Sequence, residues 1–502
     1  MKTFILLLSI LSLSYLNIYL QLERLERQHN EEGVINDFAK PAVLDSTQLD
    51  SLIINAMNIY HIPGLAALIN RKEDGLIWKR NFGYANVALN QPVEDSTLFL
   101  IGSVSKTIVA TAIMQFWEAD SFDLDDNIND YLDNFQIINP SYPNDTITIR
   151  MLMTHTSSIR DWGNWNFLYT LTSCGDSPIA LDSFLINYLT PGGLYYSGLS
   201  FYNYAPGTVW EYANVDLCVL ALLVEKFSGM SLNQYCRENI FDPLEMHKSS
   251  FLLEGLDTNN IATPYLWQGG NQYTPYCHQG HPIYPAAFLR TNKMELEHLL
   301  SAYMNWGRFN GTTILDSLTV DLILTDQLGY PVPGYGDYQG LIWYQSGELN
   351  GRFPWGHGGS WWGCRAGMFF KQQEDWGIIC FINSTPDYGA ILYLLNLLCD
   401  YAQDITDVEE ISNIISDFYL EQNFPNPFNP STTIKYSVPQ SSNVIIKVFD
   451  ILGNEIEKLV NEEKPAGTYE VTWHAVNLPS GIYFYQLKAG GFVQTKKMIL
   501  LR

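Results

Sequence analysis

The stretch Leu98-Phe99-Leu100-Ile101-Gly102-Ser103-Val104-Ser105-Lys106 is the most informative part of the sequence. A short apolar run ends at Gly102, and an apolar pattern with helical spacing begins after Lys106. Residues three apart on a helix share a face, so we expect the amine of Lys106 beside the hydroxyl of Ser103. A serine hydroxyl becomes a good nucleophile when a base takes its proton, and a lysine with a lowered pKa can be that base. Taken alone, the motif also fits a surface serine and lysine.

A second pattern, Tyr212-Ala213-Asn214, stands just before the strongly apolar helical stretch 217–224. The phenol of Tyr212 is suited to moving a proton between nucleophile and leaving group, and the amide of Asn214 to binding a substrate carbonyl. The alternative is a buried tyrosine followed by an asparagine that caps a helix.

The third pattern is His357-Gly358-Gly359-Ser360. Glycines beside a strand allow another backbone to approach closely. The N–H of Ser360 would then join the N–H of Ser103 in an oxyanion hole. A glycine-rich hairpin turn is the alternative.

Taken in order, S-x-x-K, Y-x-N and H-x-G resemble the class C β-lactamase-related serine hydrolases. This family includes β-lactamases, D-alanyl-D-alanine carboxypeptidases, D-amino-acid peptidases and esterases. Four further segments are similar to family segments: Ile62-Pro63-Gly64-Leu65-Ala66 to the first strand, Gly83-Tyr84-Ala85-Asn86 to the next turn, Leu152-Met153-Thr154-His155-Thr156-Ser157-Ser158 to "LLTHTSG", and Gly340-Leu341-Ile342-Trp343 to the "YGLGW" strand. Ser158 stands where the family usually has glycine.

The resemblance implies a mixed α/β (α+β) fold of the β-lactamase/transpeptidase type, an antiparallel sheet flanked by helices with a helical subdomain. It implies Ser103 as the acylated nucleophile, Lys106 as its base or proton relay, Tyr212 as the catalytic tyrosine and Asn214 as a substrate-binding amide. His357, Gly358, Gly359 and Ser360 are the other expected substrate-binding residues. No metal or cofactor is expected.

His357 occupies the position of the lysine in the K-T-G motif of true β-lactamases. A histidine is a weaker ligand for a substrate carboxylate at neutral pH, and we expect its titration between about pH 5 and 8 to affect activity. The leading hypothesis is therefore hydrolysis of an ester, amide or D-amino-acid peptide. A D-alanyl-D-alanine carboxypeptidase or β-lactamase, and a non-turnover sensor that binds β-lactam or peptidoglycan, are the alternatives.

Other polar residues carry weaker signals. The seven cysteines are odd in number and form no C-x-x-C, so we expect no disulfide framework, although one pair would be compatible with export. Cys277-His278-Gln279-Gly280-His281 has zinc-ligand residue types but no second ligand pair, which favours a structural loop.

His155 is expected to be buried and hydrogen-bonded. An aromatic stretch, 161–204, and Trp361 with Trp362 either line the cleft or pack in the core.

The ends of the chain differ in composition from its middle. Residues 1–21 resemble a signal peptide with one lysine and an apolar run, with an uncleaved anchor as the alternative, and no other membrane span is expected. We expect a linker over 22–45, the hydrolase domain over 46–403 and an acidic linker over 404–417. A formal net charge of −25 argues against nucleic acid as a partner.

From residue 418 onward the sequence is typical of a small β-sandwich. Short alternating segments over 432–438, 443–449, 467–473, 481–487 and 493–500 are separated by turn residues. The string Asn423-Phe424-Pro425-Asn426-Pro427-Phe428-Asn429-Pro430 and the final Lys496-Lys497 region resemble the C-terminal sorting domain of type IX secretion. The resemblance implies that 418–502 engages that secretion machinery and that the protein passes through the periplasm to the cell surface or medium. A carbohydrate-binding module is the alternative.

Overall fold

The computed structural model describes residues 45–72, 75–161, 168, 170–270, 272–332, 338–414, 418–423, 425–439, 441–465, 467–476 and 478–501. The predicted signal segment, residues 22–44 of the predicted linker, and Trp162 and Trp165 of the aromatic stretch lie outside the described residues. The chain divides into two compact units, 1–403 and 404–502, described here separately.

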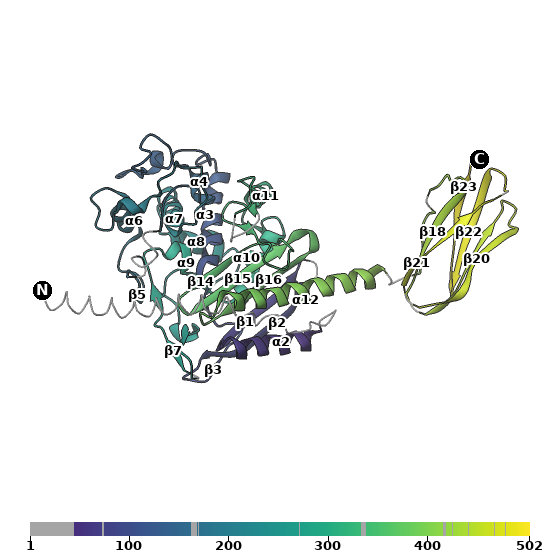
Figure 1. The fold of residues 1–502 in the computed structure, drawn as a ribbon, viewed down its shortest axis with the longest axis horizontal. Helices are drawn as coiled ribbons and strands as arrows, with labels where there is room; N and C mark the ends of the chain where they lie inside the picture. The colour runs from purple at the N-terminus through teal and green to yellow at the C-terminus, as the bar shows by residue number, and fades with distance from the viewer. Residues whose placement is uncertain are drawn as a thin grey trace. The chain divides into compact units, whose positions relative to one another are not determined.

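An antiparallel sheet of eight strands forms the centre of the first unit (Figure 1). Its strands, in spatial order, are β12 (Tyr338–Gln339), β13 (Tyr344–Gln345), β14 (Trp355–Trp361), β15 (Cys364–Lys371), β16 (Trp376–Ile382), β1 (Gly64–Arg71), β2 (Gly75–Asn86) and β3 (Gln91–Pro92). Nearly every residue of β1 and β16 is buried, which requires cover on both faces of the sheet.

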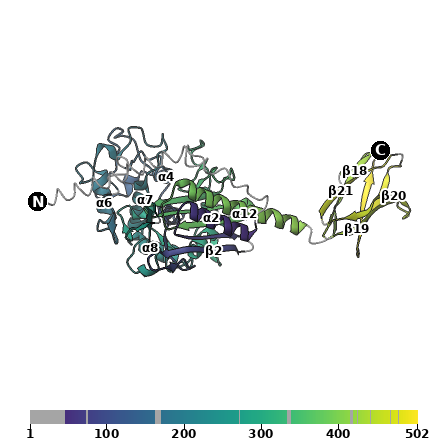
Figure 2. The same ribbon diagram turned by 60° about the horizontal axis from the view of Figure 1, so that its bottom comes forward.

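Helices supply that cover. Gly367 of β15 lies against Leu395 of α12 (Tyr388–Ile414), and Gly377 of β16 lies against Leu300 of α10 (Lys293–Met304). Gly377 pairs with Phe370, three positions after Gly367 on β15, so the two glycines face opposite sides of the sheet. The helix α2 (Ser46–Ile59) lies beside α12, as Figure 2 shows, and Tyr401 of α12 is hydrogen-bonded to Ser46.

The helical subdomain is built around α7 (Asn214–Ser228). Every α7 residue from Asn214 to Val224 is buried, the pattern of a helix surrounded by protein. The helices that pack against α7 are α3 (Lys106–Glu118), α4 (Ile149–Met153), α6 (Leu181–Leu189), α8 (Leu232–Cys236) and α9 (Tyr284–Ala287). The predicted fold, an antiparallel sheet flanked by helices with a helical subdomain, is confirmed.

Short elements complete the first unit. They are the strand pairs β4 (Phe99–Leu100) with β9 (Arg290–Thr291), β5 (Ser173–Cys174) with β8 (Gln279–Gly280), β6 (Tyr265–Trp267) with β7 (Tyr273–Pro275) and β10 (Arg308–Phe309) with β11 (Thr312–Thr313), and the helix α11 (Ser317–Ile323).

Two local expectations were wrong. The segment 83–86 is the last part of β2 and not a turn; the chain turns over 87–90. The segment 340–343 is the connection between β12 and β13 and not a strand. Within it Ile342 has φ +70°, a conformation that a β-branched residue rarely adopts and that the glycine of the similar family string adopts freely.

The second unit has two antiparallel sheets, as predicted for a small β-sandwich. One contains β17 (Tyr419–Leu420), β18 (Ser431–Val438) and β21 (Gly467–His474); the other contains β20 (Glu455–Lys464), β19 (Ser442–Phe449), β22 (Gly481–Ala489) and β23 (Phe492–Leu500). Strand β20 was not predicted because most of its residues are charged and exposed, so it shows no apolar alternation. Helix α12 runs on through 404–414, so this part of the predicted linker is helical. Within the described residues we find no helix long and apolar enough to cross a membrane.

Candidate active site

Ser103 and Lys106 lie where the apolar strand β4 gives way to α3. A single turn of 3-10 helix, η1 (Gly102–Ser105), carries Ser103, and Lys106 is the first residue of α3. The Lys106 Nζ atom is 2.9 Å from Ser103 Oγ. Ser103 remains partly exposed, whereas Lys106 is 0% exposed. The amine of Lys106 therefore lies beside the hydroxyl of Ser103, as the spacing of the motif predicts.

Two further acceptors fix the amine of Lys106. Its Nζ donates to Asn214 Oδ1 at 2.6 Å and to the carbonyl oxygen of Ala286 at 2.8 Å. Burial lowers the Lys106 pKa to about 7, against the opposing influence of the carboxylates of Asp161 and Asp216. A neutral amine keeps two N–H groups for Asn214 and Ala286 and turns its lone pair toward Ser103, which is the arrangement of a base.

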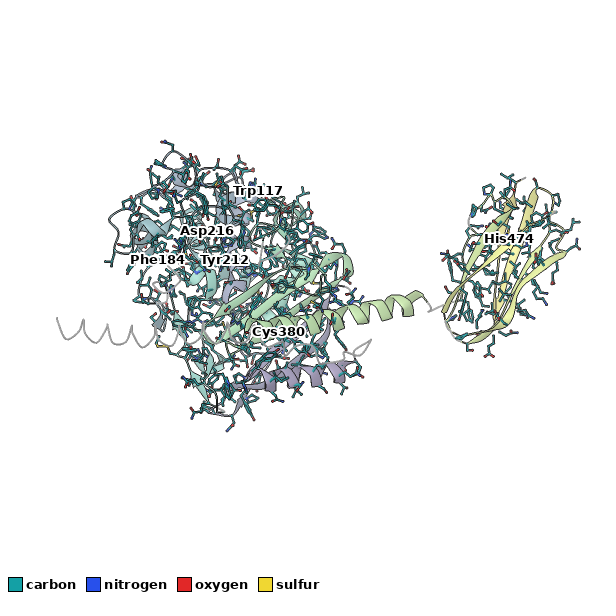
Figure 3. All side chains as sticks on the ribbon, in the orientation of Figure 1. Trp117, Phe184, Tyr212, Asp216, Cys380 and His474 are labelled. Carbon is teal, nitrogen blue, oxygen red and sulfur yellow. A yellow bond between two sulfur atoms is a disulfide. The ribbon has the colours of Figure 1, made fainter. Side chains whose placement is uncertain are left out.

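Tyr212 precedes α7 and lies beside the lysine. Its ring centroid is 4.9 Å from Lys106 Nζ and 4.6 Å from the ring centroid of His155. Figure 3 labels Tyr212 and, on α7, Asp216 in the helical subdomain. The proximity to the amine is compatible with the proton-transfer role expected from the sequence, which stays a prediction.

Asn214 is the first residue of α7 and bonds to protein at both ends of its amide. Oδ1 accepts from Lys106, and Nδ2 donates to Asp161 Oδ2 at 2.7 Å. The structure thus shows Asn214 holding Lys106, in addition to the substrate-binding role that remains a prediction. Asp161 was not singled out from the sequence, because it lies far from Asn214 in the chain and belongs to no recognised motif.

Gly359 brings strand β14 against η1. A Cβ atom added to Gly359 would lie 2.0 Å from the carbonyl oxygen of Ile101 and 3.2 Å from the backbone nitrogen of Ser103. A Cβ atom added to Gly102, whose φ is +54°, would lie 2.4 Å from the backbone nitrogen of Ser360. The two backbones are therefore in close contact beside the nucleophile, as the oxyanion-hole hypothesis for Ser103 and Ser360 requires.

His357 is buried in β14, with 2% of its surface exposed. Its Nδ1 contacts the carbonyl oxygen of Gly358 at 2.5 Å, and its ring centroid is 5.1 Å from that of Tyr344. Burial, followed by the charge of Lys106, lowers the His357 pKa to about 3. The expectation that His357 titrates between pH 5 and 8 therefore fails: the ring stays neutral there, and Lys106 is the group that titrates near neutrality.

The His155 segment supports α7 from the side. His155 is buried and its Nδ1 is 3.2 Å from Asp216 Oδ2, while Ser157 Oγ donates to Asp216 Oδ1 at 2.6 Å. The prediction that His155 is buried and hydrogen-bonded is confirmed. Ser158 has φ +65°, which explains why glycine is usual at this position in the similar family segment.

A disulfide joins Cys174 and Cys277, at the paired strands β5 and β8. The expectation of no disulfide framework did not identify this pair, because residues 103 positions apart give no signal in the sequence. It also removes Cys277 from any zinc site, and His281 Nε2 is 2.7 Å from the carbonyl oxygen of Leu168. Among the described residues, no group of three or more histidine, cysteine, aspartate or glutamate side chains is placed to hold a metal ion.

Trp361 and Trp362, which were expected either to line the cleft or to pack in the core, differ in burial. Trp361 is buried and its Nε1 donates to Gln279 Oε1 at 2.8 Å, while the Trp362 ring stacks on Tyr276. Trp361 is thus a packing residue, and Trp362 is partly exposed.

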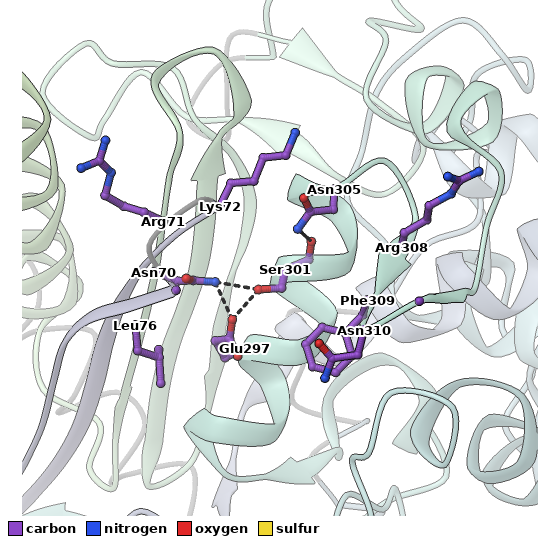
Figure 4. Close-up of a pocket in the computed structure, with 12 residues that line it drawn as sticks. Asn70, Arg71, Lys72, Leu76, Glu297, Ser301, Asn305, Arg308, Phe309 and Asn310 are labelled. Atoms are coloured by element: carbon purple, nitrogen blue, oxygen red, sulfur yellow. Dashed lines mark hydrogen bonds between the residues drawn. The ribbon is translucent and has the colours of Figure 1, made fainter. Parts of the chain in front are cut away.

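A cavity of about 590 Å³ lies elsewhere, at the turn between β1 and β2 (Figure 4). There the Asn70 amide donates to Glu297 and, at 2.6 Å, to Ser301 Oγ. None of the residues that line this cavity belongs to the network around Ser103 and Lys106, so it is not part of the candidate active site.

Comparison with known families agrees with the fold and the motifs. The family model described as Beta-lactamase matches residues 49–397, and the chain belongs to this family of serine hydrolases. The model described as Secretion system C-terminal sorting domain matches residues 422–501. The sorting domain implies secretion or a cell-surface location and involvement of the type IX machinery.

Curated relatives include penicillin-binding proteins. Penicillin-binding protein 4* of Bacillus subtilis (strain 168) is 26% identical over 258 residues, which cover 51% of this chain and 50% of that protein. Protein flp of Staphylococcus aureus (strain MW2) is 24% identical over 258 residues, which cover 51% of this chain and 49% of that protein. The chain spans about half the length of these relatives.

Solved structures share the fold at low identity. The octameric penicillin-binding protein homologue from Pyrococcus abyssi has a TM-score of 0.61 and 19% identity, covering 90% of this chain and all of that chain. EstCE1, a hydrolase with promiscuous acyltransferase activity, has a TM-score of 0.58 and 19% identity. The match covers 71% of this chain and 98% of that chain. The D-alanine carboxypeptidase AmpC from Burkholderia cenocepacia has a TM-score of 0.55 and 21% identity. The match covers 71% of this chain and 99% of that chain.

Proposed function

We propose that the protein is an exported acyl hydrolase that forms a covalent acyl-enzyme on Ser103. The observation that carries this proposal is the buried amine of Lys106, 2.9 Å from the partly exposed hydroxyl of Ser103 and held by Asn214 and Ala286. A base in hydrogen-bond contact with the nucleophile is the arrangement that activates a serine.

In the first half of the reaction, Ser103 Oγ attacks the substrate carbonyl carbon and its proton passes to Lys106 Nζ. The carbonyl oxygen becomes an oxyanion, which accepts hydrogen bonds from the backbone N–H groups of Ser103 and Ser360. The bond to the leaving alcohol or amine then breaks, and that group takes the proton from Lys106, directly or through Tyr212. Water repeats the sequence on the acyl-enzyme, releases the acid and restores Ser103.

The neutral state of His357 bears on the substrate. A buried imidazole without charge supplies no cation for a substrate carboxylate at the position where K-T-G enzymes have lysine. We therefore favour an ester, an amide or a D-amino-acid peptide as substrate over a β-lactam.

One observation favours a second candidate, a D-alanyl-D-alanine carboxypeptidase or β-lactamase. Arg365 of β15 stands opposite Ser360 in the sheet and donates from Nη1 to Ser360 Oγ. Its guanidinium therefore lies beside the last residues of β14 and supplies a cation for a substrate carboxylate, in place of the lysine that K-T-G enzymes have where this chain has His357.

Product assays separate these candidates. The full-length protein and a Ser103→Ala variant would be incubated with a short-chain nitrophenyl ester, a D-amino-acid amide, a D-alanyl-D-alanine peptide and a penicillin. Ser103-dependent turnover of ester or amide with little of the other two supports the leading proposal. Preferred release of terminal D-alanine moves the second candidate to the front. A stable penicillin adduct without turnover indicates a sensor.

A further inference from the structure

Helix α7 begins without a cap from its own sequence. Its N-cap residue is Ala213, whose side chain makes no capping hydrogen bond. The carboxylate of Asp161 takes this place from a distant part of the chain: Oδ1 accepts from the N–H of Asn214 at 3.0 Å and of Val215 at 3.2 Å, and Oδ2 from the N–H of Asn214 at 2.8 Å. An acidic side chain at a helix N-terminus is favourable both as acceptor and as charge.

The same carboxylate determines which way the Asn214 amide points. Because Oδ2 of Asp161 accepts from Asn214 Nδ2 at 2.7 Å, the amide oxygen is turned to Lys106, whose Nζ is 2.6 Å away. The reversed amide would place NH₂ against the lysine and oxygen against the carboxylate, losing both bonds. Asp161 is only 8% exposed, so little water competes for these contacts.

Several other ionisable groups surround Lys106. They are Asp216 and Cys218 on α7, His155 just after α4, Tyr212 just before α7 and His357 on β14. The pKa values of His155 and His357 are lowered, and that of Cys218 is raised well above its usual value, so burial keeps these three groups neutral near pH 7. Asp216 accepts a hydrogen bond from Ser157 and lies beside His155, and burial raises its pKa well above the usual value. Among the described residues, Asn214 bonds to Asp161 and not to Asp216.

We infer that Asp161 is a positioning residue of the active site, which caps α7, orients Asn214 and through it holds Lys106 against Ser103, and whose negative charge favours the ammonium form of Lys106. The inference rests on the proposed role of Ser103 and Lys106. It adds a residue that touches neither the nucleophile nor the substrate in the mechanism above.

The charge effect has a definite sign. Among the charges near Lys106, Asp161 has the largest influence, and it raises the lysine pKa against the effect of burial. Burial raises the pKa of Asp161 itself, while the hydrogen bonds from Asn214 and Val215 and the charge of Lys106 act in the opposite direction and favour its carboxylate form. Removing the negative charge disfavours the ammonium form, so the neutral amine exists at lower pH. The acid limb of the activity profile should therefore move to lower pH by at least about one unit in Asp161→Asn.

The test measures the rate of fluorophosphonate labelling of Ser103 in the full-length protein between pH 5 and 9, by intact mass. We expect the acid limb in Asp161→Asn at lower pH with a reduced plateau, because the Asn214 amide is no longer fixed. Asp161→Glu should keep the limb at the wild-type pH. The comparison variant is Asp216→Asn, which removes another buried carboxyl group near Lys106. Burial raises the pKa of Asp216 well above its usual value, so this group carries less charge than Asp161, and the limb should move less.

The outcomes are distinguishable. A limb in Asp161→Asn at the wild-type pH, or a larger shift in Asp216→Asn, overturns the inference. Wild-type protein that is not labelled on Ser103 overturns the proposed function instead. If Asp161→Asn does not fold by circular dichroism, Asp161→Ser replaces it, since its hydroxyl still caps α7 while the charge is lost, and the same shift is expected.

Discussion

Lys106 combines complete burial with a direct contact to the partly exposed hydroxyl of Ser103. Burial without a carboxylate partner in direct contact costs the ammonium form stability, and this is why its pKa falls to about 7. The three contacts of Nζ then determine what the amine does: two acceptors orient it, and the third partner, Ser103, is the group from which it can take a proton.

Loss of the lysine should remove the base. We expect Lys106→Met to lower kcat/KM for the best substrate by about 10²–10⁴-fold, the usual contribution of a general base. Steady-state kinetics would measure this. The matched control is Lys293→Met, another buried lysine, which bonds to Asp95 and lies outside the network. Equal losses in both variants would mean that disruption of packing, and not loss of a base, is responsible.

The pH dependence follows from the same residue. Below about pH 7 Lys106 gains a proton and cannot accept one from Ser103, so kcat/KM should fall with an acid limb near pH 7. His357, with a pKa of about 3, contributes no limb between pH 5 and 8. The measurement is a kcat/KM profile for wild type and His357→Gln. A limb that disappears in His357→Gln would show that the histidine titrates after all.

At the residue scale the sequence predicted that Lys106 lies beside Ser103, because S-x-x-K places the two residues on one helical turn, while the catalytic roles of the motif residues stay predictions. It was insufficient for Asp161, which reaches Asn214 across 53 positions and acts mainly on backbone N–H groups. It was also insufficient for the charge state of His357, since burial depends on what packs around β14 and not on the residue itself.

At the scale of elements, the contact between β14 and η1 depends on glycines that leave no room for a side chain. We expect Gly359→Ala to lower the melting temperature and to reduce acylation of Ser103 more than tenfold, because its Cβ would overlap the carbonyl oxygen of Ile101. Differential scanning fluorimetry and intact-mass labelling would measure both effects.

The neighbouring glycine gives the comparison. A Cβ at Gly358 would meet only the Tyr344 hydroxyl, at 3.2 Å, so Gly358→Ala should cost less in both measurements. Equal effects of the two substitutions would contradict the close contact between the strand and the nucleophile turn.

The disulfide links two segments that the sequence alone did not connect. Cys174–Cys277 closes a loop of about 100 residues. The free energy of unfolding of the double variant Cys174→Ser/Cys277→Ser should therefore be about 2–5 kcal/mol lower than that of wild type. Urea unfolding with and without dithiothreitol would show it. The reductant should lower the stability of wild type and leave the double variant unchanged; no difference between the two proteins would contradict a structural role.

The elements themselves were predicted with mixed success. Alternating apolar residues located β18, β19, β21, β22 and β23 to within a few residues, because one face of each is buried. The segment 340–343 was assigned wrongly because apolar composition does not distinguish a strand from a buried connection, and Ile342 takes a left-handed conformation that its residue type disfavours.

At the scale of the whole molecule, the chain combines a catalytic unit and a sorting unit with separate cores. The predicted fold of the catalytic unit is confirmed by its eight-stranded antiparallel sheet and by its match to the Beta-lactamase family model. The domain limits predicted from the sequence, 46–403 and 418–502, remain predictions alongside the division between Gln403 and Asp404.

Separate cores predict separable functions. Deletion of residues 418–502 should leave acylation of Ser103 unchanged in purified protein, while the protein expressed in a host with type IX secretion should accumulate in the periplasm. Cell fractionation with fluorophosphonate labelling tests both halves. Surface or medium location of the truncated protein would contradict the role assigned to the sorting domain.

The most direct test of the central claim is intact-mass analysis of the full-length protein after exposure to a fluorophosphonate, with ester turnover followed in the same sample. The account predicts one adduct per chain, mapped to Ser103 and absent from Ser103→Ala, together with loss of ester hydrolysis. An adduct that persists in Ser103→Ala, or hydrolysis that survives the substitution, would contradict Ser103 as the nucleophile.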